Sequence, residues 1–162
     1  MKQCQVTTLL PAPAHIIFAA VKRPSTLVYV ARGMLRFSGW RRFPVTWQVG
    51  QSLHTRLWFF HLLPAPWLHK MQVAEVDEAQ RLIRSHETSP LYTWDHTIRV
   101  EAQESLTRYT DRIDIEAGLL TWLIWLYASL FYRYRQARWR RIVARYNRPP
   151  ISEDLTHEND YP

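Results

Sequence analysis

Histidine and carboxylate side chains alternate with aliphatic ones along segments whose two-residue period is typical of β-strands. His96 lies on the apolar face of the segment 93–104, and Asp111 lies on the apolar face of the segment 107–116. Burial of both apolar faces brings a histidine and a carboxylate into one interior. Such a pair can act as a general base and its orienting partner, so His96 and Asp111 are candidate catalytic residues.

The same period places His69, Met71 and Glu87 on inward faces. A buried polar group costs several kcal/mol unless it is paired, so these groups must pair with each other or lie at a rim. His69 with Glu87 is therefore an alternative acid–base pair. Polar anchors on an otherwise apolar inner face indicate a ligand pocket. A register slip of one residue would turn each of these side chains outward.

The sequence offers neither an activated nucleophile nor a metal site. Its only cysteine is Cys4, and its histidines lack zinc-ligand spacing. We expect no metal and no cofactor. We leave enzymatic activity open and prefer non-catalytic binding.

The composition predicts one globular domain. The chain has 162 residues, of which 47% are hydrophobic and 14% aromatic, and this argues against disorder. A single cysteine allows no internal disulfide, which fits a reducing compartment. The apolar stretch 9–21 contains two prolines and a histidine, so it makes a poor signal peptide. We expect a cytoplasmic protein that can associate with a membrane peripherally.

The hydrophobic periods and the Pro and Gly breaks predict an α+β order of elements. We expect helices at 14–21, 24–33 and 119–146, and strands at 3–9, 34–37, 52–61, 67–77, 82–87, 93–104 and 107–116. Short links between the later strands imply antiparallel hairpins and hence a meander. Residues 1–148 should form the domain, and the acidic remainder 149–162 should be disordered.

The last predicted helix carries an apolar stripe that includes Trp125 and Tyr132. Arg135 falls on this stripe, and we expect its stem to pack while its charge reaches solvent; the alternative is an acidic partner inside. Most other arginines of the helix fall on the opposite side: Arg133, Arg138, Arg140, Arg141 and Arg145. With a net charge of +7, these arginines suit an anionic membrane surface. Nucleic acid is the alternative partner of this Arg- and aromatic-rich stretch.

Residues 117–132 form a run of 16 residues without charge. This run is shorter than the roughly 18–20 residues that cross a bilayer. It also follows directly after a predicted strand that must stay paired in the sheet. A buried helix and a membrane span explain the run equally well. Partial insertion at a membrane interface is a third interpretation.

The order of elements and several local segments resemble the START-like (SRPBCC, helix-grip) superfamily from about Gln5 to Arg145. The segments are LPAPAHIIFAAVKRPSTL, WQVG followed by TRL, LPAPWLHKMQVAEVDEAQRLIRSHE, TWDHTIRV, TRYTDRIDIEAGLLT and FYRYRQARW. The resemblance implies a curved antiparallel sheet of about seven strands wrapped around a long C-terminal helix, with two short helices after the first strand. It also implies a cavity for lipids, sterols, polyketides, quinones or other apolar molecules.

The resemblance and the inward faces together lead to one preferred function, which is a carrier or sensor of a hydrophobic molecule or lipid. The alternatives are a cyclase- or hydrolase-like enzyme in the same cavity and a basic surface module that binds an anionic membrane or nucleic acid. The residues expected to line the ligand site are His69, Met71, Glu87, Trp94, His96, Ile98, Val100, Asp111, Ile113, Trp125, Tyr132 and Arg135.

Overall fold

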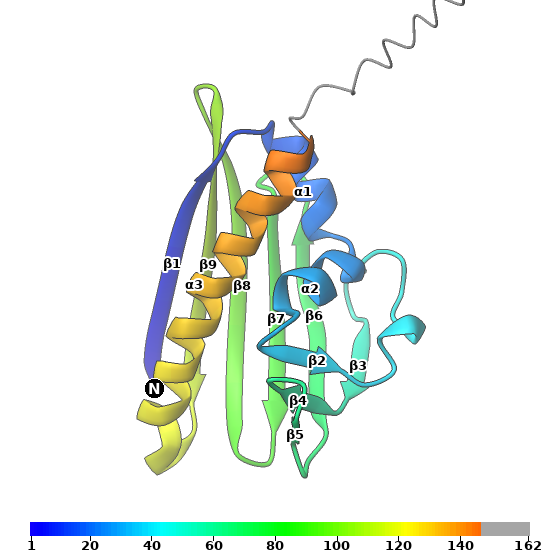
Figure 1. The fold of residues 1–162 in the computed structure, drawn as a ribbon, viewed down its shortest axis with the longest axis vertical. Coiled ribbons are helices and arrows are strands. Elements are labelled where there is room, and N and C mark those ends of the chain that lie inside the picture. Colours follow the sequence, from blue (N-terminus) through cyan, green and yellow to red (C-terminus); the bar gives the residue numbers. More distant parts are fainter. Residues whose placement is uncertain (147–162) are drawn as a thin grey trace, which may run out of the picture.

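The structure, a computed structural model, describes the backbone of residues 1–146 and the side chains as far as Ala144. Its main layer is a six-stranded antiparallel sheet in the order β1-β9-β8-β7-β6-β3. The strands of this sheet are β1 (Lys2–Leu10), β3 (Ser52–Thr55), β6 (His69–Asp77), β7 (Leu82–Ser89), β8 (Tyr92–Gln103) and β9 (Leu106–Glu116). All the remaining elements lie on one side of the sheet (Figure 1). The predicted α+β helix-grip architecture is confirmed.

Three helices cover the inner face of the sheet. The short helices α1 (Ala14–Val21) and α2 (Pro24–Ala31) follow β1, and each begins beside a proline whose fixed backbone suits a first helical turn. The long helix α3 (Thr121–Tyr146) crosses in front of β1, β9 and β8 (Figure 1). Its predicted stripe is buried at Ala128, Tyr132, Trp139 and Val143. No helix in the described part of the chain is long and apolar enough to span a membrane.

The register of β8 on β9 decides which polar side chains face inward. His96 is paired with Ile113, and Ile98 is paired with Asp111. Along both strands buried residues alternate with exposed or half-buried ones, and His96 and Asp111 are among the buried residues. The predicted inward faces of these two strands are therefore confirmed.

The predicted single strand 52–61 is wrong. The chain leaves the main sheet after Thr55, and β4 (Leu57–Phe59) pairs instead with β2 (Leu35–Phe37) and β5 (Leu63–Pro64) in a second, three-stranded sheet. The strand cannot continue past Phe59, because the next two residues adopt left-handed φ angles of 50° and 63°. The other predicted elements agree with the structure to within two residues at each end. The predicted acidic tail lies outside the described residues.

Candidate functional site

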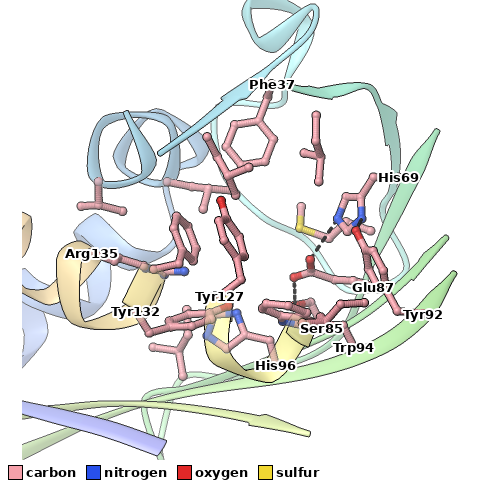
Figure 2. Close-up of a pocket in the computed structure, with 18 of the residues that line it drawn as sticks. Phe37, His69, Ser85, Glu87, Tyr92, Trp94, His96, Tyr127, Tyr132 and Arg135 are labelled. Carbon is pink, nitrogen blue, oxygen red and sulfur yellow. Dashed lines mark hydrogen bonds and ion pairs between the residues drawn. The ribbon is translucent and has the colours of Figure 1, made fainter. Parts of the chain in front are cut away.

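A cavity of about 460 Å³ lies between the main sheet, α3 and the second sheet. Most of its lining is aliphatic or aromatic, and Figure 2 shows these side chains surrounding the space. Each structural layer contributes: Met71 and Ile98 from the main sheet, Phe37 from the second sheet and Phe131 from α3. The volume falls within the range of roughly 300–1,000 Å³ that is usual for small-molecule pockets.

Eight of the predicted site residues line this cavity: His69, Met71, Glu87, Trp94, His96, Ile98, Tyr132 and Arg135. The other four are not among the lining residues. Val100 and Ile113 are almost fully buried in the packed core, and Asp111 is fully buried beside His96. Trp125 faces β1, where its indole N–H donates to the carbonyl of Gln3 at 2.8 Å.

One cluster of polar side chains in the cavity wall is centred on Glu87. His69 Nε2 lies 2.9 Å from Glu87 Oε2, and the Ser85 hydroxyl donates to Glu87 Oε1 at 3.1 Å (Figure 2). The other ring nitrogen of His69, Nδ1, lies 3.0 Å from the Tyr92 hydroxyl. Burial alone would raise the pKa of the Glu87 carboxyl, but the hydrogen bond and charge of His69 oppose it and hold the pKa below its ordinary value. Glu87 is therefore a carboxylate, and both nitrogens of His69 are engaged.

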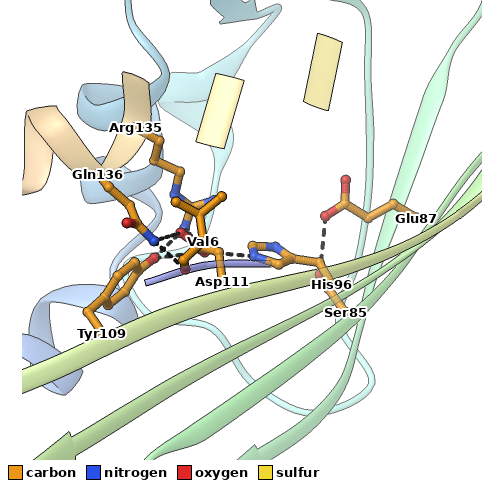
Figure 3. Close-up of polar contacts among 8 residues, drawn as sticks. All are labelled: Val6, Ser85, Glu87, His96, Tyr109, Asp111, Arg135 and Gln136. Carbon is orange, nitrogen blue, oxygen red and sulfur yellow. Dashed lines mark hydrogen bonds and ion pairs between the residues drawn. The ribbon is translucent and has the colours of Figure 1, made fainter. Parts of the chain in front are cut away.

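A second cluster of polar side chains is centred on Asp111, which is wholly inaccessible to solvent. Asp111 Oδ1 lies 2.9 Å from His96 Nε2 and accepts a hydrogen bond from the Tyr109 hydroxyl at 3.0 Å (Figure 3). Gln136 lies 3.5 Å from the other carboxylate oxygen. Burial alone would raise the pKa of Asp111, but the charge of Arg135 and the hydrogen bond from His96 hold it below its ordinary value.

Arg135 does not reach solvent, so the expectation that its charge snorkels outward is wrong. The side chain is buried, its Nη2 lies 3.7 Å from Asp111 Oδ1, and Nη2 also donates to the Tyr109 hydroxyl at 3.1 Å. The alternative, an acidic partner inside, is what the structure contains. An arginine buried in this way needs that carboxylate, because an unpaired charge in the interior is strongly destabilising.

The protonation of His96 follows from its carboxylate partner. An ionised carboxylate only accepts hydrogen bonds, so Nε2 of His96 carries a proton. The remaining ring nitrogen, Nδ1, has no hydrogen-bond partner among the described side chains. Because His96 lines the cavity, an oriented imidazole with one uncommitted nitrogen is part of the cavity wall. Among residues 1–146 no group of histidine, cysteine and carboxylate side chains is arranged to hold a metal ion.

Sequence reasoning missed two members of the Asp111 group. Tyr109 lies two residues before Asp111 on the same face of β9, so the strand period could have identified it. Gln136 follows Arg135 on α3, and nothing in the helical pattern marks it as an inward polar residue. The cavity residues of the second sheet were also missed, because no local pattern reveals that β4 pairs with β2.

Comparison with solved structures identifies the class of fold. A START superfamily protein from Mycobacterium smegmatis matches with a TM-score of 0.62 at 11% identity, over 89% of this chain and 98% of that one. Protein CV1439 from Chromobacterium violaceum matches with a TM-score of 0.68 at 12% identity, over 87% and 96% of the two chains. The chain has the helix-grip fold of the START-like superfamily, as the sequence resemblance implied.

An enzyme also shares this fold. A point mutant of norcoclaurine synthase from Thalictrum, in complex with a transition state analogue, matches with a TM-score of 0.65 at 14% identity, over 91% and 96% of the two chains. No family model matches the chain, and no curated protein sequence does either. At these identities the matches establish the fold and leave the function to be argued from the site.

Proposed function

We propose that this protein binds a hydrophobic small molecule or lipid in the cavity between the main sheet and α3, as a carrier or sensor. The observation that carries the proposal is the 460 Å³ apolar cavity, in whose wall the ionisable side chains are already paired, Glu87 with His69 and His96 with Asp111. A ligand that enters such a space need not displace strong polar contacts. It gains about 25 cal/mol for each Å² of apolar surface removed from water.

The position of the polar groups favours a ligand with an apolar body and a small polar end. His69, Glu87 and Tyr92 form one polar patch in the cavity wall. His96 and Arg135 form another on the opposite part of the wall (Figure 2). A hydroxyl or carbonyl group of the ligand at either polar patch can form hydrogen bonds with these side chains. The rest of the ligand would lie against the aliphatic and aromatic lining.

Native mass spectrometry of protein purified without detergent tests the proposal, combined with binding of the uncharged fluorophore N-phenyl-1-naphthylamine. Met71→Trp fills the cavity from β6 and should abolish both copurified mass and fluorophore binding. Gln72→Trp, on the other face of the same strand, is the matched control and should change neither. The proposal is wrong if the wild-type protein binds nothing, or if both variants bind equally well.

A second candidate function is a cyclase- or hydrolase-like enzyme that acts in the same cavity. The uncommitted Nδ1 of His96, on a ring oriented by Asp111, is the observation that favours it. If the protein is an enzyme, the active wild-type protein should copurify with its product and an inactive variant with its substrate. We would therefore extract and identify what copurifies with the wild-type protein and with His96→Ala. Identical molecules from both proteins argue for a carrier, and a substrate–product pair argues for catalysis.

A further inference from the structure

Three segments without charged residues come together at one end of the molecule. Residues 57–68, 88–94 and 117–132 contain no Asp, Glu, Lys or Arg. Figure 1 shows that β4 and β5, the turn between β7 and β8, and the start of α3 all lie at the lower end. Exposed side chains of these segments form what we call the apolar rim, which consists of Phe60, Leu62, Leu63, Leu119, Trp122 and Leu123. Leu119 is wholly exposed and Leu62 is 77% exposed.

The apolar rim surrounds the opening of the cavity. Of the described residues that line the cavity, Leu91, Leu120 and Leu123 are the most exposed, at 40%, 43% and 58%, and all three belong to these same segments. The rings of Phe60 and Tyr127 meet at 6.3 Å, which joins the second sheet to α3 at this end. A ligand that enters beside these leucines therefore passes through the apolar rim.

Positive charge without negative charge adjoins the rim. Residues 1–74 contain nine Lys and Arg and no Asp or Glu. Arg36 is the middle residue of β2, and Arg56 precedes β4. Both are exposed, and the Arg36 guanidinium lies 4.4 Å from the Trp58 ring centroid. Arg32 is also exposed, and the next backbone N–H, that of Gly33, donates to His61 of the 57–68 segment at 3.0 Å.

Negative charge at this end lies on a different surface. Asp95 and Glu116 are exposed on the outer face of the main sheet, opposite in direction to Trp94 and Ile115. The surface that combines the apolar rim with the second sheet is thus apolar and cationic. Of the arginines predicted to face a membrane from α3, Arg138 contributes less to a free surface, because it donates to the carbonyl of Tyr29 and packs over its ring. Arg133, Arg140 and Arg141 are exposed. The side chain of Arg145 lies outside the described residues.

We propose that the apolar rim and the adjoining arginines dock this protein on an anionic lipid bilayer, with the cavity opening against the membrane. Exposed Leu, Phe and Trp side chains gain free energy at the headgroup boundary, and nearby arginines are attracted by anionic lipids. A nucleic acid would pair with the arginines and leave the leucines in water, so it fits the surface less well. Docking in this orientation would let a hydrophobic ligand pass between bilayer and cavity without crossing water.

Vesicle flotation tests the proposal, with one set of vesicles made of equal parts phosphatidylglycerol and phosphatidylcholine and another of phosphatidylcholine alone. The wild-type protein should float with the anionic vesicles, and high salt should weaken this association because it screens the charges. Leu62→Glu with Leu119→Glu should reduce binding at least tenfold. Neither leucine lines the cavity, so fluorophore binding should survive in this variant, which separates the docking proposal from the proposed function.

Matched controls use exposed residues away from the rim. Val45→Glu with Val49→Glu introduces the same charge on two exposed aliphatic residues and should leave flotation unchanged. Arg36→Gln with Arg56→Gln should weaken binding about fivefold per arginine, whereas Arg99→Gln with Arg108→Gln, on the outer face of the main sheet, should not. The proposal is overturned if the wild-type protein does not float, if the rim and control variants behave alike, or if DNA binds and the leucine substitutions leave that binding intact.

Discussion

Asp111 links the main sheet to α3 through its hydrogen-bond partners. Its carboxylate contacts a histidine of β8, a tyrosine of its own strand and an arginine and a glutamine of α3. Because burial removes the solvation of a carboxylate, these partners together must replace it. The same contacts fix the orientation of His96, whose ring is part of the cavity wall.

We expect Asp111→Asn to lower the free energy of unfolding by about 3–5 kcal/mol. The substitution removes the negative charge and leaves the buried Arg135 without a counter-ion. Urea denaturation of the two proteins measures the difference. Asp95→Asn is the control, because its pair with His86 is on the surface, where such pairs contribute about 1 kcal/mol or less.

Removal of both charges separates the cost of an unpaired charge from the cost of lost packing. Asp111→Leu combined with Arg135→Leu leaves no uncompensated charge and should be more stable than Asp111→Asn. A double variant that is less stable than the single one would show that lost packing and lost hydrogen bonds to His96, Tyr109 and Gln136 outweigh the cost of the unpaired charge.

The lowered pKa of Glu87 predicts how stability changes with pH. In the unfolded chain this carboxyl takes up a proton near its ordinary pKa of 4.5, whereas in the folded protein it does so at a lower pH. Between these two values the unfolded state binds more protons, so the free energy of unfolding falls as the pH falls. Urea denaturation from about pH 6 to about pH 3 should show this loss, and Glu87→Gln should show a smaller one. Equal slopes in the two proteins would contradict a lowered pKa.

At the scale of single residues, the sequence predicts most of the polar side chains of the site and their pairing. A two-residue period is enough to place these side chains inside, because His69, His96 and Asp111 alternate with apolar residues on one face and Glu87 shares the face of Ile83. Arg135 was misjudged because arginine on an apolar helical stripe usually extends its charge to solvent. Its partner comes from a strand 24 residues earlier in the chain, and helical periodicity contains no information about that contact.

The second sheet shows what local patterns cannot predict at the scale of elements. Residues 52–59 keep an extended conformation on both sides of Arg56, so the sequence suggested one strand. The two parts pair with different strands, β6 for the first and β2 for the second. Strand pairing over such distances depends on which surfaces the helices leave uncovered. It was therefore missed, and with it the cavity wall that contains Phe37 and Leu57.

The close approach of α3 to the end of α2 makes Gly33 sensitive to substitution. A Cβ atom at Gly33 would lie 2.5 Å from the Tyr134 hydroxyl oxygen, which donates to the carbonyl of Arg32. Gly39 also has a positive φ angle, but a Cβ atom there meets nothing within 4 Å. Gly39→Ala should cost about 1–2 kcal/mol for its left-handed φ of 67°. Gly33→Ala has a less favourable φ of 108° and adds the contact with Tyr134. Thermal denaturation should show that Gly33→Ala is the less stable of the two.

Tyr134→Phe provides the control for this comparison. It removes the oxygen that a Cβ atom at Gly33 would approach most closely. In that background the difference between the two glycine substitutions should shrink. If the difference is unchanged, the cost at Gly33 comes from its backbone conformation and not from contact with α3.

At the scale of the whole molecule, the cavity divides the apolar interior. One packed cluster contains Val30, Ile98 and Trp139, and the other contains Leu35, Trp94 and Phe131, and all six of these residues also line the cavity. Protein interiors are normally close-packed, with few voids larger than a water molecule. A space of 460 Å³ bordered by both packed clusters therefore supports the proposed ligand site.

This division predicts that ligand binding stabilises the whole fold. A ligand that binds only the folded state at 100 times its Kd adds about 2.7 kcal/mol to the free energy of unfolding. For a chain of this size that corresponds to a rise in Tm of roughly 5–10 °C. A thermal-shift screen of fatty acids, sterols, quinones and aromatic polyketides should therefore identify the ligand class by its Tm. The shift should be absent in Met71→Trp and retained in Gln72→Trp. A compound that raises the Tm of Met71→Trp as much as that of the wild-type protein binds elsewhere, and the cavity would then not be its site.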